Sequence, residues 1–186
     1  MDDKDKKLLL KLARESIESY FKNQEPNINE VLHLNRDRGV FVTLHKQGRL
    51  RGCVGYPEPV MPLFKAVVDA ARSAAFKDNR FPPLTKDEIR HIKIEISVLT
   101  PPEFIKVDDF EEYKQKIELG KDGLILRGSH NSGLLLPQVA TENNFTWEQF
   151  LNALSQKAGL GFSAWQDLDN QIFKFQAQIF LEEKFN

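Results

Sequence analysis

Two apolar segments separated by a tight turn constrain the fold of this chain more than any other feature. Residues 39–46 are rich in β-branched and aromatic side chains, Gln47-Gly48 has the composition of a two-residue turn, and residues 49–56 resume the strand pattern. Such a pair of segments is typical of a β-hairpin. Counting outward from the turn predicts these cross-strand partners: Lys46 with Arg49, Thr43 with Gly52, and Val42 with Cys53.

Cys53, the only cysteine, lies in the second arm of this hairpin. Because side chains alternate along a strand, Arg51 and Cys53 are expected on one face, where a guanidinium favours the reactive thiolate. Gly52 and Gly55 leave the backbone bare for a ligand or another chain to approach. The alternative is that Cys53 is a small buried hydrophobe, and periodicity does not decide because both hairpin faces carry apolar residues.

Two further polar groups belong to the candidate site. Asp78 and Arg80 lie in a turn beside two prolines, where they either form an ion pair that fixes the turn or bind and orient a substrate group. Glu95 lies among isoleucines in the middle of a predicted strand. If that face of the sheet is covered, Glu95 needs a partner, and Arg51 is the suggested one.

The remaining pattern favours an α+β fold with an antiparallel or mixed sheet, because hairpins dominate the strand pairs. Helices are expected over residues 5–22, 62–76 and 146–158. Capping-box spacing is present at Thr146 and Gln149 in the last of these, and at Thr85 and Glu88 before a short helix. Strands are expected over residues 91–99, 124–127, 134–136 and 172–181.

Composition narrows the class of protein. A chain of 186 residues with 41% hydrophobic residues suits one domain, with or without a small second lobe. The 26 basic and 27 acidic residues give no reason to expect strong non-specific nucleic-acid binding. One cysteine excludes an internal disulfide, and the four histidines lack metal-site spacing, so no metal is expected. No cofactor motif, transmembrane run or signal-peptide core is found, which points to the cytoplasm and away from a membrane.

Five stretches, in order, resemble one family. They are Gly39–Leu44 running into Leu50–Tyr56 (with Arg-Gly-Cys-Val-Gly at 51–55), then 74–83, Ile94–Pro102, 134–140 (Leu-Leu-Leu-Pro-Gln-Val-Ala), and 157–160 with Trp165. Together they resemble the AMMECR-one domain family from about Val40 to the C-terminus, with Val54 in place of the isoleucine of its Arg-Gly-Cys-Ile-Gly hallmark. The resemblance implies an α+β fold with a mainly antiparallel sheet, flanking helices and a smaller second lobe.

The resemblance implies a candidate functional site but does not imply a particular reaction. The family has no established activity, is grouped by fold with nucleotide-, nucleic-acid- and peptide-binding domains, and has genes beside those of Memo-like and radical-SAM proteins, which makes these candidate partners. Many relatives carry a second cysteine where this chain has Ser155, and a small hydroxyl residue where it has Tyr56. The matched polar or special positions are Arg51, Gly52, Cys53, Gly55, Asp78, Arg80, Glu95, Ser97 and Gln138.

Two hypotheses follow. In the first, the protein is a thiol-dependent enzyme with Cys53 as nucleophile, Arg51 as activator or anion clamp, and Glu95 and Asp78 as acid/base or orienting groups. Its substrate is a nucleotide, an RNA or a protein side chain, bound by residues drawn from Gly52, Gly55, Arg80, Ser97 and Gln138. In the second, it is a non-catalytic binding module whose glycines expose backbone to a peptide, a nucleic acid or a Memo-like or radical-SAM partner, while Cys53 only packs.

Overall fold

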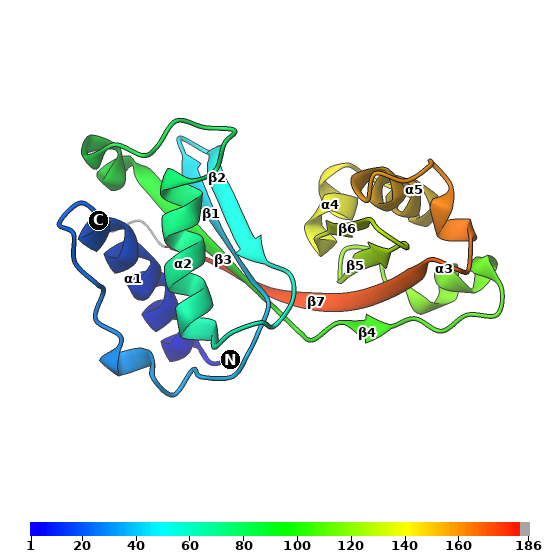
Figure 1. Cartoon of the computed structure of the whole chain (residues 1–186), viewed down its shortest axis with the longest axis horizontal. Helices are drawn as coiled ribbons and strands as arrows, with labels where there is room; N and C mark the ends of the chain where they lie inside the picture. The colour runs from blue at the N-terminus through cyan, green and yellow to red at the C-terminus, as the bar shows by residue number, and fades with distance from the viewer. Residues whose placement is uncertain (183–186) are drawn as a thin grey trace. The chain divides into compact units, whose positions relative to one another are not determined.

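The structure is a computed structural model that describes residues 1–182 as two compact units (Figure 1). Among the described residues, the larger unit comprises 1–99 and 178–182, and the smaller comprises Thr100–Ala177. Helices are interspersed with antiparallel strands in both, so the predicted α+β fold is confirmed. Within the described residues, no helix is both long and apolar enough to cross a membrane.

The larger unit is a sheet with two helices on one face. Strand β1 (Val40–Lys46) pairs with β2 (Arg49–Tyr56) on one side and β3 (Ile92–Leu99) on the other, both antiparallel. Helices α1 (Asp3–Tyr20) and α2 (Leu63–Phe76) lie side by side against this sheet (Figure 1). The core between them contains the inward side chains of both layers, namely Leu9, Leu12, Ala13, Ile17, Val40, Val42, Leu44, Val67, Ala70, Ala71, Ile94 and Ile96.

The helices of this unit begin within two residues of their predicted starts. Helix α1 begins at Asp3, two residues before the predicted start, because the Asp2 side chain accepts the Asp5 N–H as an N-cap. Helix α2 follows Pro62, whose ring fits the start of a helix. The predicted loop 23–38 contains one 3₁₀ turn, η1 (Asn29–Val31).

The end of the described chain returns to the larger unit. Glu182 accepts two hydrogen bonds from the Arg14 guanidinium, each 2.5 Å long, and its main-chain N–H donates to the Ile94 carbonyl at 2.8 Å. Arg14 also donates to the Ile89 and Ile92 carbonyls. One buried carboxylate therefore ties helix α1, strand β3 and the end of the chain together.

The smaller unit packs its helices on a second set of strands. Strand β7 (Gln171–Leu181) pairs with β4 (Glu103–Phe104) and with β5 (Asp122–Arg127), and β5 pairs with β6 (Ser132–Leu135). The helical segments are η3 (Phe110–Glu112), α3 (Tyr113–Lys116), α4 (Pro137–Glu142), α5 (Trp147–Lys157) and η4 (Ala164–Gln166). Their core centres on Trp165, Phe150, Leu124 and Leu126.

The Ser155 hydroxyl links two segments of the smaller unit through hydrogen bonds. It is fully buried, its hydroxyl donates to the Leu151 carbonyl at 3.1 Å, and its oxygen accepts the Trp165 N–H at 3.1 Å. The hydroxyl therefore helps to fix the segment that carries the central tryptophan. Ser155 lies on helix α5, and the capping box predicted at the start of this helix, Thr146 with Gln149, is confirmed.

Candidate functional site

The hairpin has the predicted turn but a different register. Gln47 (φ 53°) and Gly48 (φ 75°) both adopt the left-handed region that a type I′ turn requires, and Lys46 faces Arg49 as predicted. Between Leu44 and His45 the register shifts, so the predicted partners of Thr43 and Val42 are wrong by one residue. The observed pairs are His45 with Leu50, Leu44 with Gly52, Thr43 with Cys53, and Val42 with Val54.

The cause of the shift is a β-bulge in which Arg51 is the extra residue. A bulge re-aims the side chain it carries, and the Arg51 guanidinium donates to Glu88 from Nε (3.2 Å) and from Nη2 (3.0 Å). Lys46 donates to the same carboxylate at 2.7 Å. Within residues 1–182 no hydrogen bond joins Arg51 to the Cys53 thiol. The guanidinium expected to activate the thiol is therefore bonded to Glu88 instead.

Glu88 is the centre of this ion cluster. It lies in the 3₁₀ segment η2 (Lys86–His91), where the predicted capping box with Thr85 is present. The Arg51 guanidinium and the Lys46 ammonium hold the pKa of the Glu88 carboxyl well below its usual range. Arg51 itself is only 9% exposed, and its Nη1 has no hydrogen-bond partner among the described residues.

Cys53 is held through both its main chain and its sulfur. Its N–H donates to Asp78 Oδ2 at 2.8 Å, and its carbonyl accepts from Arg80 Nη2 at 3.2 Å, so both main-chain groups point away from β1. The facing pair Thr43–Cys53 is therefore the non-hydrogen-bonded kind, in which opposed side chains come closest. Accordingly, the Thr43 hydroxyl donates to the half-buried Cys53 sulfur at 3.3 Å.

Asp78 and Arg80 form the ion pair that was one of the two interpretations of their turn. Arg80 donates to Asp78 from Nη2 (2.7 Å) and from Nε (2.9 Å), and the guanidinium holds the pKa of the buried Asp78 carboxyl well below its usual range. The two side chains also form hydrogen bonds with the N–H and carbonyl of Cys53. These main-chain groups point outward from the edge strand β2 and would otherwise have no partner there.

The face of the sheet opposite the helices carries a row of polar side chains. Thr43 on β1 faces Cys53 on β2 and Glu95 on β3, so these three lie in line across the strands. His45 shares this face, because it lies two residues from Thr43, and its Nε2 is 3.5 Å from Glu95 Oε2. The side chain facing Glu95 is thus His45, and the expectation that Arg51 would pair with Glu95 is wrong, because Arg51 pairs with Glu88.

The two glycines beside Cys53 are explained by packing inside the unit. A Cβ at Gly52 would lie 2.2 Å from the Ala74 carbonyl oxygen of α2, and a Cβ at Gly55 would lie 2.2 Å from the Val40 carbonyl oxygen. Each glycine therefore allows a close approach between parts of the protein itself. A ligand is not needed to account for either residue.

The remaining predicted binding residues divide between the two units. Ser97 is buried on β3, opposite Phe41. Gln138 lies in the smaller unit, near the start of α4, with its Oε1 buried and without a hydrogen-bond partner among the described residues. No group of three or more His, Cys, Asp or Glu side chains in the described part of the chain is arranged to hold a metal ion.

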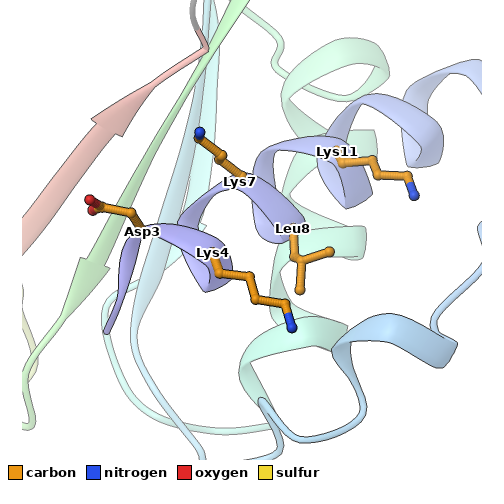
Figure 2. A pocket seen from close by; sticks show the side chains of 5 residues that line it. All are labelled: Asp3, Lys4, Lys7, Leu8 and Lys11. Carbon is orange, nitrogen blue, oxygen red and sulfur yellow. The ribbon is translucent and has the colours of Figure 1, made fainter.

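Two surface hollows lie on helix α1. One, of about 440 Å³, is lined by Asp3, Lys4, Lys7, Leu8 and Lys11 (Figure 2). Figure 2 shows Lys7 pointing away from Lys4 and Lys11, so the three ammonium groups do not converge on one point. The other, of about 780 Å³, lies between α1 and residues 180–182 and includes both Arg14 and Glu182. Neither hollow includes Cys53.

The residues that sequence reasoning missed are Thr43, His45 and Glu88. Thr43 and His45 are two residues apart on β1, so the sequence indicates that they share a face of the sheet. It does not indicate which residues of β2 they face, because the bulge shifts the register. Glu88 is recognisable in the sequence only as a capping-box residue. Its role as the partner of Arg51 depends on a contact across 37 positions of the chain.

Comparison with known proteins identifies the family. The AMMECR1 family model matches residues 10–180. A protein from Methanothermobacter thermautotrophicus is 46% identical over 180 residues, which cover 94% of this chain and 93% of the relative, and one from Methanocaldococcus jannaschii is 46% identical over 176 residues, covering 93% and 88%. The crystal structure of an uncharacterized protein from Pyrococcus horikoshii superposes with a TM-score of 0.91 at 42% identity, covering 98% of this chain and 94% of that one. The chain therefore belongs to the AMMECR1 family.

Proposed function

We propose that this protein is a thiol-dependent enzyme with Cys53 as its nucleophile. The observation that carries the proposal is the hydrogen bond from the Thr43 hydroxyl to the Cys53 sulfur, 3.3 Å long, on the face of the sheet that α1 and α2 leave uncovered. A donor aimed at sulfur stabilises the thiolate more than the thiol, and the thiolate is the nucleophilic form.

Rigid placement of the sulfur supports the same function. Cys53 lies on a strand, and Asp78 and Arg80 hold its main chain from the outer edge while β1 holds the other side. A nucleophile on a fixed strand keeps its geometry better than one on a loop. In this proposal Asp78 positions Cys53 and does not act as acid or base, because both of its oxygens already accept hydrogen bonds.

Arg51 and Arg80 take different parts from those expected from the sequence. Arg51 supports the bulge through Glu88 and does not activate the thiol. Arg80 donates to the Cys53 carbonyl, and its side chain is 54% exposed, so it is the cation available to an anionic group of a substrate. Among the substrate classes considered, this charge favours a nucleotide or an RNA.

The chemical step has two halves. The Cys53 sulfur bonds to an electrophilic atom of the substrate, the thiol proton leaves to a base, and the substrate's leaving group departs with the electron pair of its broken bond. Water then breaks the sulfur–substrate bond, its hydroxyl remaining on the substrate and its proton returning to the sulfur.

The test uses the single cysteine, since any adduct with iodoacetamide reports on Cys53 alone. Intact mass after brief treatment of the native protein at pH 7 is expected to show one stoichiometric adduct, which is lost in Cys53→Ala. Thr43→Val is expected to react more slowly, while Thr141→Val, an exposed threonine of the smaller unit, serves as the matched control. Labelling that requires prior unfolding would contradict the proposal and would favour a binding module in which Cys53 only packs.

A further inference from the structure

We propose that His45, oriented by Glu95, accepts the proton of the Cys53 thiol. This inference rests on the proposed function, since it names the base that the thiol step requires. The sequence pattern did not indicate His45, whose place beside the reactive row follows from the register of the three strands.

The strand geometry brings the imidazole to the same face as the sulfur. Thr43 faces Cys53, and His45 is the next residue of β1 on that face, so His45 is a diagonal neighbour of Cys53 across the hairpin. Diagonal cross-strand neighbours have Cα atoms ~7–8 Å apart, which long side chains can span. The side chains extend toward each other from these Cα atoms, and a base takes a proton when its nitrogen comes within about 3 Å of the donor atom or is joined to it by one bridging water.

Glu95 lies beside one of the two ring nitrogens of His45. Its Oε2 lies 3.5 Å from His45 Nε2, an atom that is buried and makes no hydrogen bond with any described residue. A carboxylate on this side of the ring favours the neutral tautomer with its proton on Nε2, in which Nδ1 is the accepting nitrogen. The side chains of His45 and Glu95 are 29% and 23% exposed, so their interaction is less screened than on an open surface.

The surrounding charges both favour and oppose an imidazolium. From β3, Glu95 favours the charged ring, whereas Lys93, directly opposite His45, opposes it. From β2, the Cys53 thiolate formed in the step favours it, and Leu50, directly opposite His45, carries no charge. The thiol and the imidazole therefore exchange one proton as a coupled pair, with Glu95 compensating the charge that the ring gains.

Alkylation by iodoacetamide contains the same proton transfer and can be followed without a known substrate. The Cys53 sulfur forms a bond to the methylene carbon, iodide leaves with the electron pair of the carbon–iodine bond, and the thiol proton goes to His45 Nδ1. The rate below the ordinary thiol pKa, about 8.5, then depends on His45.

The experiment measures alkylation rates from pH 5 to 9 for wild type, His45→Gln, Glu95→Gln and the control His33→Gln, whose ring contacts Asp5 on helix α1. We expect His45→Gln to react about tenfold or more slowly at pH 7 and to recover as pH rises past about 8.5. Glu95→Gln should show a smaller loss in the same direction, and His33→Gln should match wild type.

The outcomes separate this inference from the proposed function. If native wild type alkylates rapidly and His45→Gln and Glu95→Gln match it at every pH, the assignment of His45 is wrong while Cys53 remains a reactive thiol. If native wild type does not alkylate, the proposed function fails first. Thermal unfolding of each variant establishes that it is folded, and the two substitutions test the pair independently.

Discussion

Arg51, the extra residue of a β-bulge, and Glu88 form a two-point ion pair with N–O distances of 3.2 and 3.0 Å. The guanidinium next to the cysteine in the sequence is thus occupied by a carboxylate 37 positions away. Lys46 joins the same carboxylate, so the cluster holds the end of the hairpin against η2. We therefore expect the main role of Arg51 to be stabilisation of the fold and not participation in the chemical step.

Replacing Glu88 by Gln should lower the free energy of unfolding at pH 7 by about 2–3 kcal/mol, because two buried or half-buried cations lose their partner. The pKa of Glu88 is lower in the folded protein than in the unfolded chain, so its stabilisation is present above the unfolded pKa and is lost as pH falls. Urea unfolding at several pH values should therefore show a weaker loss of stability below about pH 5 in Glu88→Gln than in wild type. The exposed Glu111→Gln serves as control, and identical pH profiles for Glu88→Gln and wild type would exclude this role.

Asp78→Asn should destabilise the larger unit by about 1–3 kcal/mol, since the buried carboxylate bonds both Arg80 and the Cys53 N–H. Asp87→Asn, an exposed residue nearby, should be within about 0.5 kcal/mol of wild type. Denaturant midpoints compare the two. Equal midpoints would mean that the edge of β2 does not depend on this side chain.

Gly52→Ala should cost about 1–3 kcal/mol, because its Cβ would lie 2.2 Å from the Ala74 carbonyl oxygen and α2 would have to move. Gly161→Ala meets nothing within 4 Å and should be tolerated. Thermal unfolding of both variants measures the difference. A Gly52→Ala protein as stable as wild type would show that this glycine serves something other than close packing.

Glu182→Gln should lower the free energy of unfolding by about 3 kcal/mol, because it leaves the half-buried Arg14 without its charged partner. Glu118→Gln removes a solvent-exposed pair with Lys121 and should cost at most about 1 kcal/mol. Guanidinium chloride is unsuitable because it screens ion pairs, so urea is the denaturant of choice. Similar losses of unfolding free energy in the two variants would contradict a stabilising role for the ion pair between Arg14 and Glu182.

The features that sequence could predict are those set by neighbouring residues. The turn at Gln47-Gly48, the capping boxes at Thr85 and Thr146, and the alternating strand β3 follow from local propensity and periodicity. The hairpin-rich pattern and the resemblance to the family both predicted the α+β class, which the structure confirms.

The features that sequence could not predict depend on one extra residue or on distant contacts. No residue near Arg51 in the sequence indicates a bulge, yet this one extra residue shifts the partner of every residue beyond it. The approach of His45 to Glu95 spans 50 positions and needs the strand register to be known. Likewise, nothing near Glu182 in the sequence indicates Arg14, which is 168 positions away.

The most direct test of a reactive Cys53 is its second-order rate constant for iodoacetamide at pH 7, measured on the native chain and on the same chain in urea. If Thr43 and the face of the sheet around it activate the sulfur, the native rate should equal or exceed the unfolded rate. A native rate of about one hundredth of the unfolded rate or less would mean that the sulfur reacts only when the fold opens, and Cys53 would then be a packing residue.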